Sequence, residues 1–78
     1  MRVLVRHFAS LRERRGRSEE ELEVAAGTTA GQLYASLFPP GPEGALPVLY
    51  AVNREYTRAG HVLVDGDEVV FVPPLGGG

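Results

Sequence analysis

The chain has 78 residues, which is room for one small domain with a single core. It contains no cysteine, which excludes disulfides, thiolate metal sites and cysteine nucleophiles, and its two histidines are too few for a dedicated zinc or haem site. The net charge of −2 argues against a protein that binds polyanions in general, so we expect no nucleic-acid partner. No segment approaches the roughly 20 apolar residues of a membrane span, so we expect a cytoplasmic protein that does not bind a membrane.

The first half of the chain predicts two strands around a short helix. Residues 2–8 are rich in β-branched and aromatic side chains, which is typical of a strand. A Ser-x-x-Glu capping box from Ser10 to Glu13 then predicts a helix that ends at Gly16. Residues 20–25 alternate between apolar and acidic side chains, which favours a strand with one solvated face.

The main helix follows a second capping box. Thr29 and Gln32 form a Thr-x-x-Gln pattern, and the apolar side chains behind it recur at helical spacing. These apolar residues are Ala30, Leu33, Tyr34 and Leu37. Their stripe predicts a helix that covers a sheet, and the proline- and glycine-rich residues 39–47 form a loop after it.

The remaining elements complete a sheet. Residues 48–52 are a continuous apolar run, typical of a strand covered on both faces, and residues 53–55 turn the chain. Residues 61–64 are a short strand or an extended loop, residues 65–67 supply turn chemistry, and residues 68–72 form the last strand. This order predicts an α+β fold, in which a mixed sheet has one main helix packed on one face.

The last strand is apolar on both faces. Val69 and Phe71 point one way, whereas Val70 and Val72 point the other way. Because one main helix covers only one face, the second face stays partly exposed or meets a partner.

The arginines are unevenly distributed. All eight basic residues are arginine; residues 1–17 hold six of them against one glutamate, whereas the remainder holds two against nine acids. We interpret these arginines as facing the acidic segment Glu19–Glu23 across neighbouring elements. Docking onto an acidic protein partner is the alternative, and the arginine-rich helix with Arg14 and Arg15 has no role assigned from the sequence.

The last six residues of the chain are predicted to project from the domain. Pro73 and Pro74 cannot donate sheet hydrogen bonds, so residues 73–78 form a tail on a domain of residues 1–72, with a reach of about 20 Å when extended. Its last three residues, Gly76 to Gly78, make it thin enough to insert into another protein's active site. The terminal carboxylate is a poor electrophile, so its reaction needs covalent activation as an acyl-adenylate made from ATP. An inert glycine tail is the alternative.

Three segments resemble a known family. The end of the chain reads Asp65-Gly66-Asp67-Glu68-Val69, then Phe71-Val72-Pro73-Pro74-Leu75-Gly76-Gly77-Gly78. Earlier segments read Phe8-Ala9-Ser10-Leu11-Arg12-Glu13 and Ala51-Val52-Asn53. This pattern resembles the small, sulfur-carrying subunit of molybdopterin synthase, in the MoaD/ThiS group of ubiquitin-like proteins. The resemblance covers essentially the whole chain and implies a ubiquitin-like β-grasp fold.

The resemblance also implies a mechanism. Gly78 would be adenylated by an E1-like enzyme that uses ATP, and a sulfur donor would convert it to a thiocarboxylate. The tail, with Gly76 and Gly77, would enter a pocket of a large catalytic subunit. That subunit would supply the catalytic residues, so this chain would bind no cofactor and would not be an enzyme alone. The sulfur would build the dithiolene of molybdopterin, the ligand of the molybdenum cofactor. Family members generally need only the last two glycines, so Gly76 is a departure.

A docking face for that large subunit is predicted by strand alternation. Its residues are Phe8, Leu63, Val70, Val72 and Leu75. Three alternatives to the molybdopterin pathway remain at this stage. The chain could carry sulfur for thiamine, cysteine or tRNA thiolation, could be a ubiquitin-like modifier that joins Gly78 to lysines of other proteins, or could be a β-grasp interaction domain with an inert tail.

Overall fold

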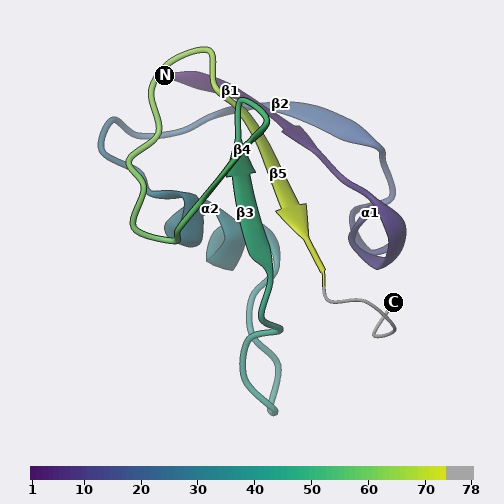
Figure 1. Cartoon of the computed structure of the whole chain (residues 1–78). Helices are drawn as coiled ribbons and strands as arrows, with labels where there is room; N and C mark the ends of the chain where they lie inside the picture. Colours follow the sequence, from purple (N-terminus) through teal and green to yellow (C-terminus); the bar gives the residue numbers. More distant parts are fainter. Residues whose placement is uncertain (74–78) are drawn as a thin grey trace.

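Seven elements make up the part of the chain that the computed structural model describes, residues 1–73 (Figure 1). In chain order they are β1 (Arg2–Arg6), α1 (Ala9–Arg15), β2 (Glu19–Glu23), α2 (Ala30–Leu37), β3 (Leu49–Val52), β4 (Glu55–Thr57) and β5 (Glu68–Val72). The strands form one sheet in the order β2-β1-β5-β3-β4. The β1–β5 pair is parallel and the other pairs are antiparallel, so the mixed sheet with one main helix is confirmed.

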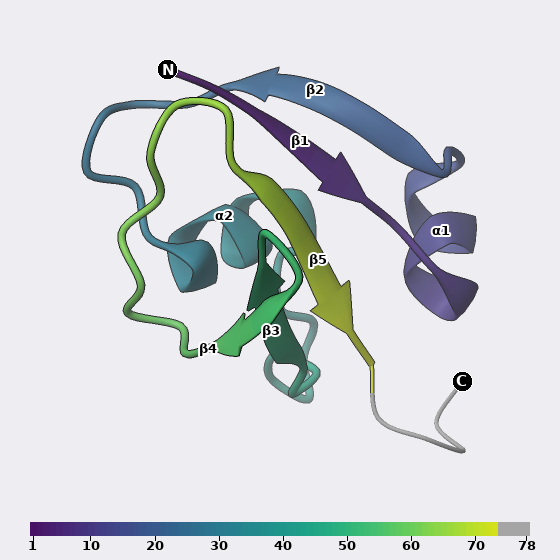
Figure 2. The same cartoon turned by 45° about the horizontal axis from the view of Figure 1, so that its top comes forward.

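Helix α2 covers one face of this sheet, and the core lies between them (Figure 2). Its predicted capping box is confirmed, because the Gln32 amide donates to Thr29 Oγ1 and the Thr29 amide donates to Gln32 Oε1. Inside, Tyr34 lies against Phe71, with ring centroids 5.1 Å apart, and against Phe38 at 5.4 Å. These aromatic contacts stabilise the helix–sheet packing beyond the area they bury.

The start of α2 depends on one glycine. A Cβ placed on Gly31 would lie 2.8 Å from the Cβ of Ala59, which follows β4 in the chain. The Gly31 amide also donates to the Ala59 carbonyl at 2.8 Å. Glycine is therefore required here by close approach rather than by an unusual backbone angle.

Two of the sequence segments that carried the family resemblance meet between β3 and β5. Asn53 Nδ2 donates to Asp67 Oδ1 at 2.8 Å, and the Glu68 amide donates to Asn53 Oδ1 at 3.0 Å. The other carboxylate oxygen of Asp67 accepts from the Val64 amide at 2.8 Å. Because Asp67 is buried, these bonds satisfy a group that is costly to leave unpaired. The two segments are thus a structural brace at the end of the sheet where β5 begins.

Two local predictions are wrong, and one strand was not predicted. The Ser10 capping box does not form, because α1 begins earlier: the Leu11 and Arg12 amides donate to the Phe8 carbonyl, and Ser10 Oγ finds no hydrogen-bond partner among residues 1–73. The N-cap residue Phe8 contributes no side-chain cap, and Ala9 enters the helix with φ of 49°.

Strand β3 is covered on one face only, since Leu49 is 59% exposed. Strand β4 was not predicted. It is joined to β3 by a two-residue turn in which Asn53 and Arg54 have φ of 52° and 69°. Positive φ at both positions is the geometry of hairpin turns, but the sequence has arginine where glycine is the usual signal.

The amino terminus is held against β2. The Met1 ammonium donates to the Val24 carbonyl at 2.9 Å and lies 3.2 Å from Glu23 Oε2. Within residues 1–73, neither α1 nor α2 has the length and the apolar character that a membrane-spanning helix needs.

Candidate functional site

The sheet has one face without a helix over it, called here the open face. Strand β5 shows the division, because Val69 and Phe71 are fully buried against α2 whereas Val70 and Val72 on the other side are half-buried. Residues directly opposite on neighbouring strands share a face. The pairs Leu49↔Val72 and Ala51↔Val70 therefore extend the open face onto β3.

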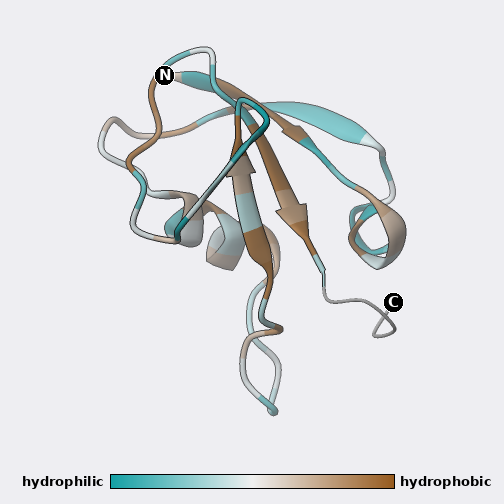
Figure 3. Ribbon diagram, in the orientation of Figure 1, coloured by the Kyte–Doolittle hydropathy of each residue, from teal (hydrophilic) through white to brown (hydrophobic). Residues whose placement is uncertain are grey.

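The open face is apolar over β3, β4 and β5. Tyr56 on β4 pairs with Ala51 and is 74% exposed, and Leu49 is 59% exposed. Figure 3 shows β3 and β5 coloured mainly as hydrophobic, in contrast to β2. We call this area the apolar half of the open face; its residues are Leu49, Ala51, Tyr56, Val70 and Val72.

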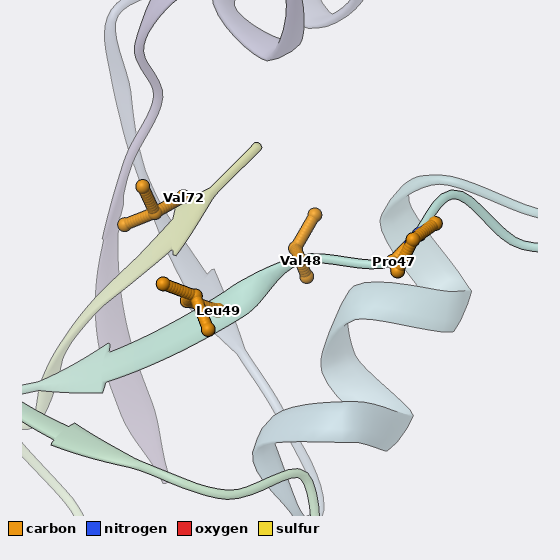
Figure 4. A pocket seen from close by; sticks show the side chains of 4 residues that line it. All are labelled: Pro47, Val48, Leu49 and Val72. Carbon is orange, nitrogen blue, oxygen red and sulfur yellow. The ribbon is translucent and has the colours of Figure 1, made fainter. Parts of the chain in front are cut away.

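A groove opens where the apolar half meets the end of β5. It has a volume of about 190 Å³ and is lined by Pro47, Val48, Leu49 and Val72. Figure 4 shows Leu49 and Val72 side by side on neighbouring strands, with Val48 and Pro47 continuing the line. Because β5 ends at Val72, the groove lies directly beside the point where the predicted tail begins.

The other half of the open face, over β1 and β2, is charged. Arg6 lies 3.6 Å from Glu19 and 3.4 Å from Glu68, and Arg2 lies 3.5 Å from Glu23. For Arg2 and Arg6, these contacts confirm the interpretation that arginines of residues 1–17 face the acids of β2; for Arg12 and Arg14 the interpretation is wrong, because neither forms an ion pair within residues 1–73. The Arg2–Glu23 and Arg6–Glu19 pairs are solvent-exposed and contribute little to stability, and the Arg6–Glu68 pair is partly buried; together they keep this half polar.

Phe8 lies at the junction of the two halves. It is 51% exposed and follows the buried His7, so its side chain is on the open side of β1. Continuing the parallel register beyond Arg6↔Val70 brings Phe8 level with Val72. Phe8, Val70 and Val72, which the sequence assigned to one docking face, therefore lie on the same side of the sheet.

Leu63 does not belong to this group, and its assignment to the docking face is wrong. It is 1% exposed and belongs to the core, and its amide donates to the Thr28 carbonyl at 2.9 Å. Its neighbours Val62 and Val64 are the exposed residues, so the alternation was assigned one residue out of register. Leu75, Gly76, Gly77 and Gly78 lie outside the described residues.

Sequence reasoning missed Leu49 and Tyr56. Leu49 was hidden in an apolar run that suggested burial on both faces, and Tyr56 follows a turn without the usual glycine. The sequence held one signal for them. The last strand is apolar on both faces, which indicates that its uncovered apolar face continues onto the neighbouring strand of the sheet.

A buried charged cluster lies beside the segment between β1 and α1 that contains Phe8. Arg15 on α1 donates to both carboxylate oxygens of Glu20, at 2.8 and 2.7 Å. Since an ionised carboxylate only accepts, His7 Nε2 is the donor to Glu20 Oε2 at 2.7 Å. The hydrogen bond from Arg15 is the main cause that lowers the pKa of Glu20 to about 2, with His7 contributing in the same direction and burial opposing both. The cluster joins β1, α1 and β2 around Phe8.

Within the part of the chain described, the acidic and histidine side chains form no cluster of three that could hold a metal ion. The candidate site is a surface that consists of the apolar half of the open face, the groove and the exposed ring of Phe8.

Comparison with known proteins shows where this arrangement occurs. Residues 5–78, almost the entire chain, match the ThiS family. The chain belongs to the ThiS family. The resemblance noted in the sequence is thereby confirmed.

Curated relatives match this ThiS-family chain over its full length. The molybdopterin synthase sulfur carrier subunit of Chlamydomonas reinhardtii is 35% identical over 83 residues, and the match covers 100% of both chains. The protein of the same name from Mycobacterium tuberculosis is 37% identical over 82 residues, covering 100% of this chain and 99% of that one.

A solved structure confirms the fold of the ThiS-family chain. SAMP1 from Haloferax volcanii, a small archaeal modifier protein, matches with a TM-score of 0.79 at 25% identity and 100% coverage of both chains. The ubiquitin-like β-grasp expected from the sequence is therefore the observed fold.

Proposed function

We propose that this ThiS-family protein is the sulfur carrier subunit of a molybdopterin synthase. The observation that carries the proposal is its similarity to two molybdopterin synthase sulfur carrier subunits along the full chain, tail included. The fold supports it, because β5 ends at Val72 beside an uncovered apolar surface.

The chemistry takes place at Gly78. Its carboxylate attacks the α-phosphorus of ATP on an E1-like activating enzyme, pyrophosphate leaves, and an acyl-adenylate results. Hydrosulfide-level sulfur from a donor then attacks the acyl carbon, the acyl–phosphate bond breaks, and AMP and a proton leave to give a thiocarboxylate. The thiocarboxylate is the better nucleophile, and it attacks the pyranopterin precursor inside the large subunit. Because this activation consumes ATP, we place the protein in the cytoplasm.

The protein itself supplies the carrier and the docking surface, whereas the large subunit supplies the catalytic residues. We propose that the docking surface comprises Phe8, the apolar half of the open face and Leu75. Exposed aromatic and aliphatic side chains around a groove have the composition of an interface core. The large subunit, the activating enzyme and the sulfur donor are thus the expected partners, and no cofactor is bound by this chain.

Intact-mass spectrometry tests the proposal directly. Incubation with ATP, the cognate activating enzyme and a sulfur donor should exchange one oxygen for one sulfur at the terminus. Adding the large subunit and the cyclic precursor should then return the carboxylate and yield the dithiolene. If the sulfur-loaded protein forms but no dithiolene appears, the molybdopterin pathway is wrong and a different sulfur pathway is served.

The tail needs substitutions rather than deletions, because removing any one of the three glycines gives the same sequence. Gly77→Ala and Gly78→Ala should reduce sulfur transfer strongly, since a side chain obstructs entry of the tail into a narrow pocket. Because family members generally need only the last two glycines, Gly76→Ala should reduce sulfur transfer less than either of these substitutions. Equal losses at all three positions would show that Gly76 belongs to the inserted segment.

A protein modifier is the second candidate function, because SAMP1 shares the fold along its full length. In that case the activated Gly78 would form an isopeptide bond with a lysine of another protein. Adding a cell extract to the activated chain and searching for conjugates separates the two functions: conjugates that disappear with Gly78→Ala would favour the modifier.

A further inference from the structure

Two arginines of α1 form no ion pair within residues 1–73, unlike the other arginines of residues 1–17. Arg12 and Arg14 are both exposed, and within residues 1–73 neither lies within ion-pair distance of a carboxylate. In contrast, Arg15 is held in the buried cluster by Glu20, and Arg2 and Arg6 pair with acids of β2. The side chains of Arg12 and Arg14 are therefore presented outward, with the exposed Glu13 between them in the chain, whereas the charge of Arg15 is neutralised by Glu20.

Arg14 is also held in a defined place. Its guanidinium carbon lies 5.1 Å from the centroid of the Phe38 ring, which belongs to the core. A cation over an aromatic face loses conformational freedom but keeps its N–H groups free to donate outward. The charge is therefore oriented before any partner arrives.

The position of α1 relates this charge to the candidate site. The helix follows Phe8 directly, and Phe8 is level with Val72 at the end of β5. Figure 2 shows α1 and the end of β5 at the same end of the sheet. Arg2 and Arg54 lie at the opposite end, where β1 begins and β3 turns into β4.

We propose that Arg12 and Arg14 contact an acidic protein surface beside the opening that receives the tail. The inference rests on the proposed function, and the surface belongs to the large subunit. A continuous polyanion is a poorer fit, because β2 presents Glu19, Glu21 and Glu23 next to α1 and the chain as a whole is negative. Arg12 and Arg14 are two residues apart and lie on different sides of α1, and carboxylates placed on both sides of the helix meet them without facing that acidic edge.

The physical role of such a contact is to orient the encounter. Complementary charges at the edge of an interface raise the association rate and set the orientation more than they change the dissociation rate. For a tail that must enter a pocket end-on, an attraction beside the opening favours the productive approach. The effect weakens as salt screens the charges.

Stopped-flow association with the purified large subunit tests the proposal. Arg12→Gln with Arg14→Gln should lower the association rate by about tenfold at low ionic strength and flatten its salt dependence, with less than about twofold change in the dissociation rate. Arg2→Gln with Arg54→Gln is the matched control: it removes the same charge from exposed pairs at the opposite end and should stay within about twofold of wild type. Arg12→Lys with Arg14→Lys should restore most of the rate, because charge rather than guanidinium shape carries the effect.

The outcomes are distinguishable. Equal slowing by the two glutamine pairs would overturn the proposal, since net charge alone would then explain the rate. Failure of the lysine pair to restore the rate would also overturn it. Tight binding of a single-stranded RNA probe that only the Arg12/Arg14 pair abolishes would replace the protein partner by a nucleic acid. If the wild-type protein forms no complex with the large subunit, the proposed function itself fails.

Discussion

Both faces of the sheet carry apolar side chains, but these side chains serve different functions on the two faces. On the face against α2, Phe71 and Val69 are fully buried, and Tyr34 and Phe38 complete the packing. On the open face, equally apolar residues of β3, β4 and β5 remain in contact with solvent. Hydrophobic area lost from water on the first face stabilises the fold, whereas area still exposed on the second can be lost only on binding. The same alternating strand therefore contributes to both stability and association.

The largest expected difference between the faces is at Phe71. Replacement by alanine should lower the free energy of unfolding by about 3–5 kcal/mol, because it removes a buried ring and leaves a cavity among the aromatic side chains. Val70→Ala, next to it on the open face, should cost about 1 kcal/mol or less. Urea unfolding followed by circular dichroism measures both. Similar losses at the two positions would contradict the division of the sheet into a packed and an open face.

The buried cluster should contribute nearly as much as the aromatic core. Glu20→Gln leaves Arg15 without its buried carboxylate, so we expect a loss of about 3 kcal/mol in the free energy of unfolding. Glu21→Gln is the matched control, because Glu21 is exposed on the same strand and should change stability by less than about 0.5 kcal/mol.

The same cluster predicts a pH dependence. The pKa of Glu20 is about 2 in the folded protein and 4.5 ordinarily, so its contribution is fully present above about pH 4.5 and is lost as the pH falls toward 2. The wild-type protein should lose about 3 kcal/mol over that range on this account. Urea unfolding between pH 7 and 2 should show a flatter curve for Glu20→Gln. Parallel curves for the two proteins would show that another group controls acid stability.

A smaller effect is expected where α2 meets the loop after β4. Gly31→Ala places a Cβ against Ala59 and should cost about 1–3 kcal/mol through overpacking. Gly41→Ala, where nothing lies within 4 Å of the new Cβ, is the control and should be nearly neutral. Thermal unfolding distinguishes the two, and a neutral Gly31→Ala would show that the backbone at Ala59 moves easily.

The smallest effect on stability, and the most informative on function, is expected at Leu49. Leu49→Ser should change the free energy of unfolding by less than about 0.5 kcal/mol but raise the dissociation rate from the large subunit by about tenfold. Val64→Ser is matched in exposure, at 60% against 59%, and lies outside the apolar half. Surface plasmon resonance should show an effect for Leu49 alone. An equal effect at Val64 would move the docking surface away from the open face.

The parts of the fold that follow local rules were predictable. Thr29 and Gln32 satisfy each other within one turn, so the start of α2 is readable from four residues. Strand β5 was readable because both its faces are apolar and two prolines follow it. The excess apolar face of β5 also indicated an interaction surface before the neighbouring strands were known.

The sequence predictions were wrong where tertiary contacts, rather than local sequence, determine the conformation or the burial of a residue. Ser10 has the type and spacing of an N-cap, but the Phe8 carbonyl accepts the first helical bonds and leaves the hydroxyl inside α1. Leu63 lies in a loop whose pairing with Thr28 fixes its direction, and alternation in so short a segment does not define which side is buried. Tyr56 could be placed on the open face only once the register with Ala51 was known.

The position of the Met1 ammonium has a consequence for the activated protein. The chain has no lysine, so this ammonium is its sole primary amine, and it is occupied by the Val24 carbonyl and Glu23 at the end of the sheet away from α1. Arginine stays protonated and is a poor nucleophile. An acyl group activated at Gly78 therefore meets no lysine side chain on neighbouring copies, so the side chains of the carrier do not compete with the sulfur donor as amine nucleophiles.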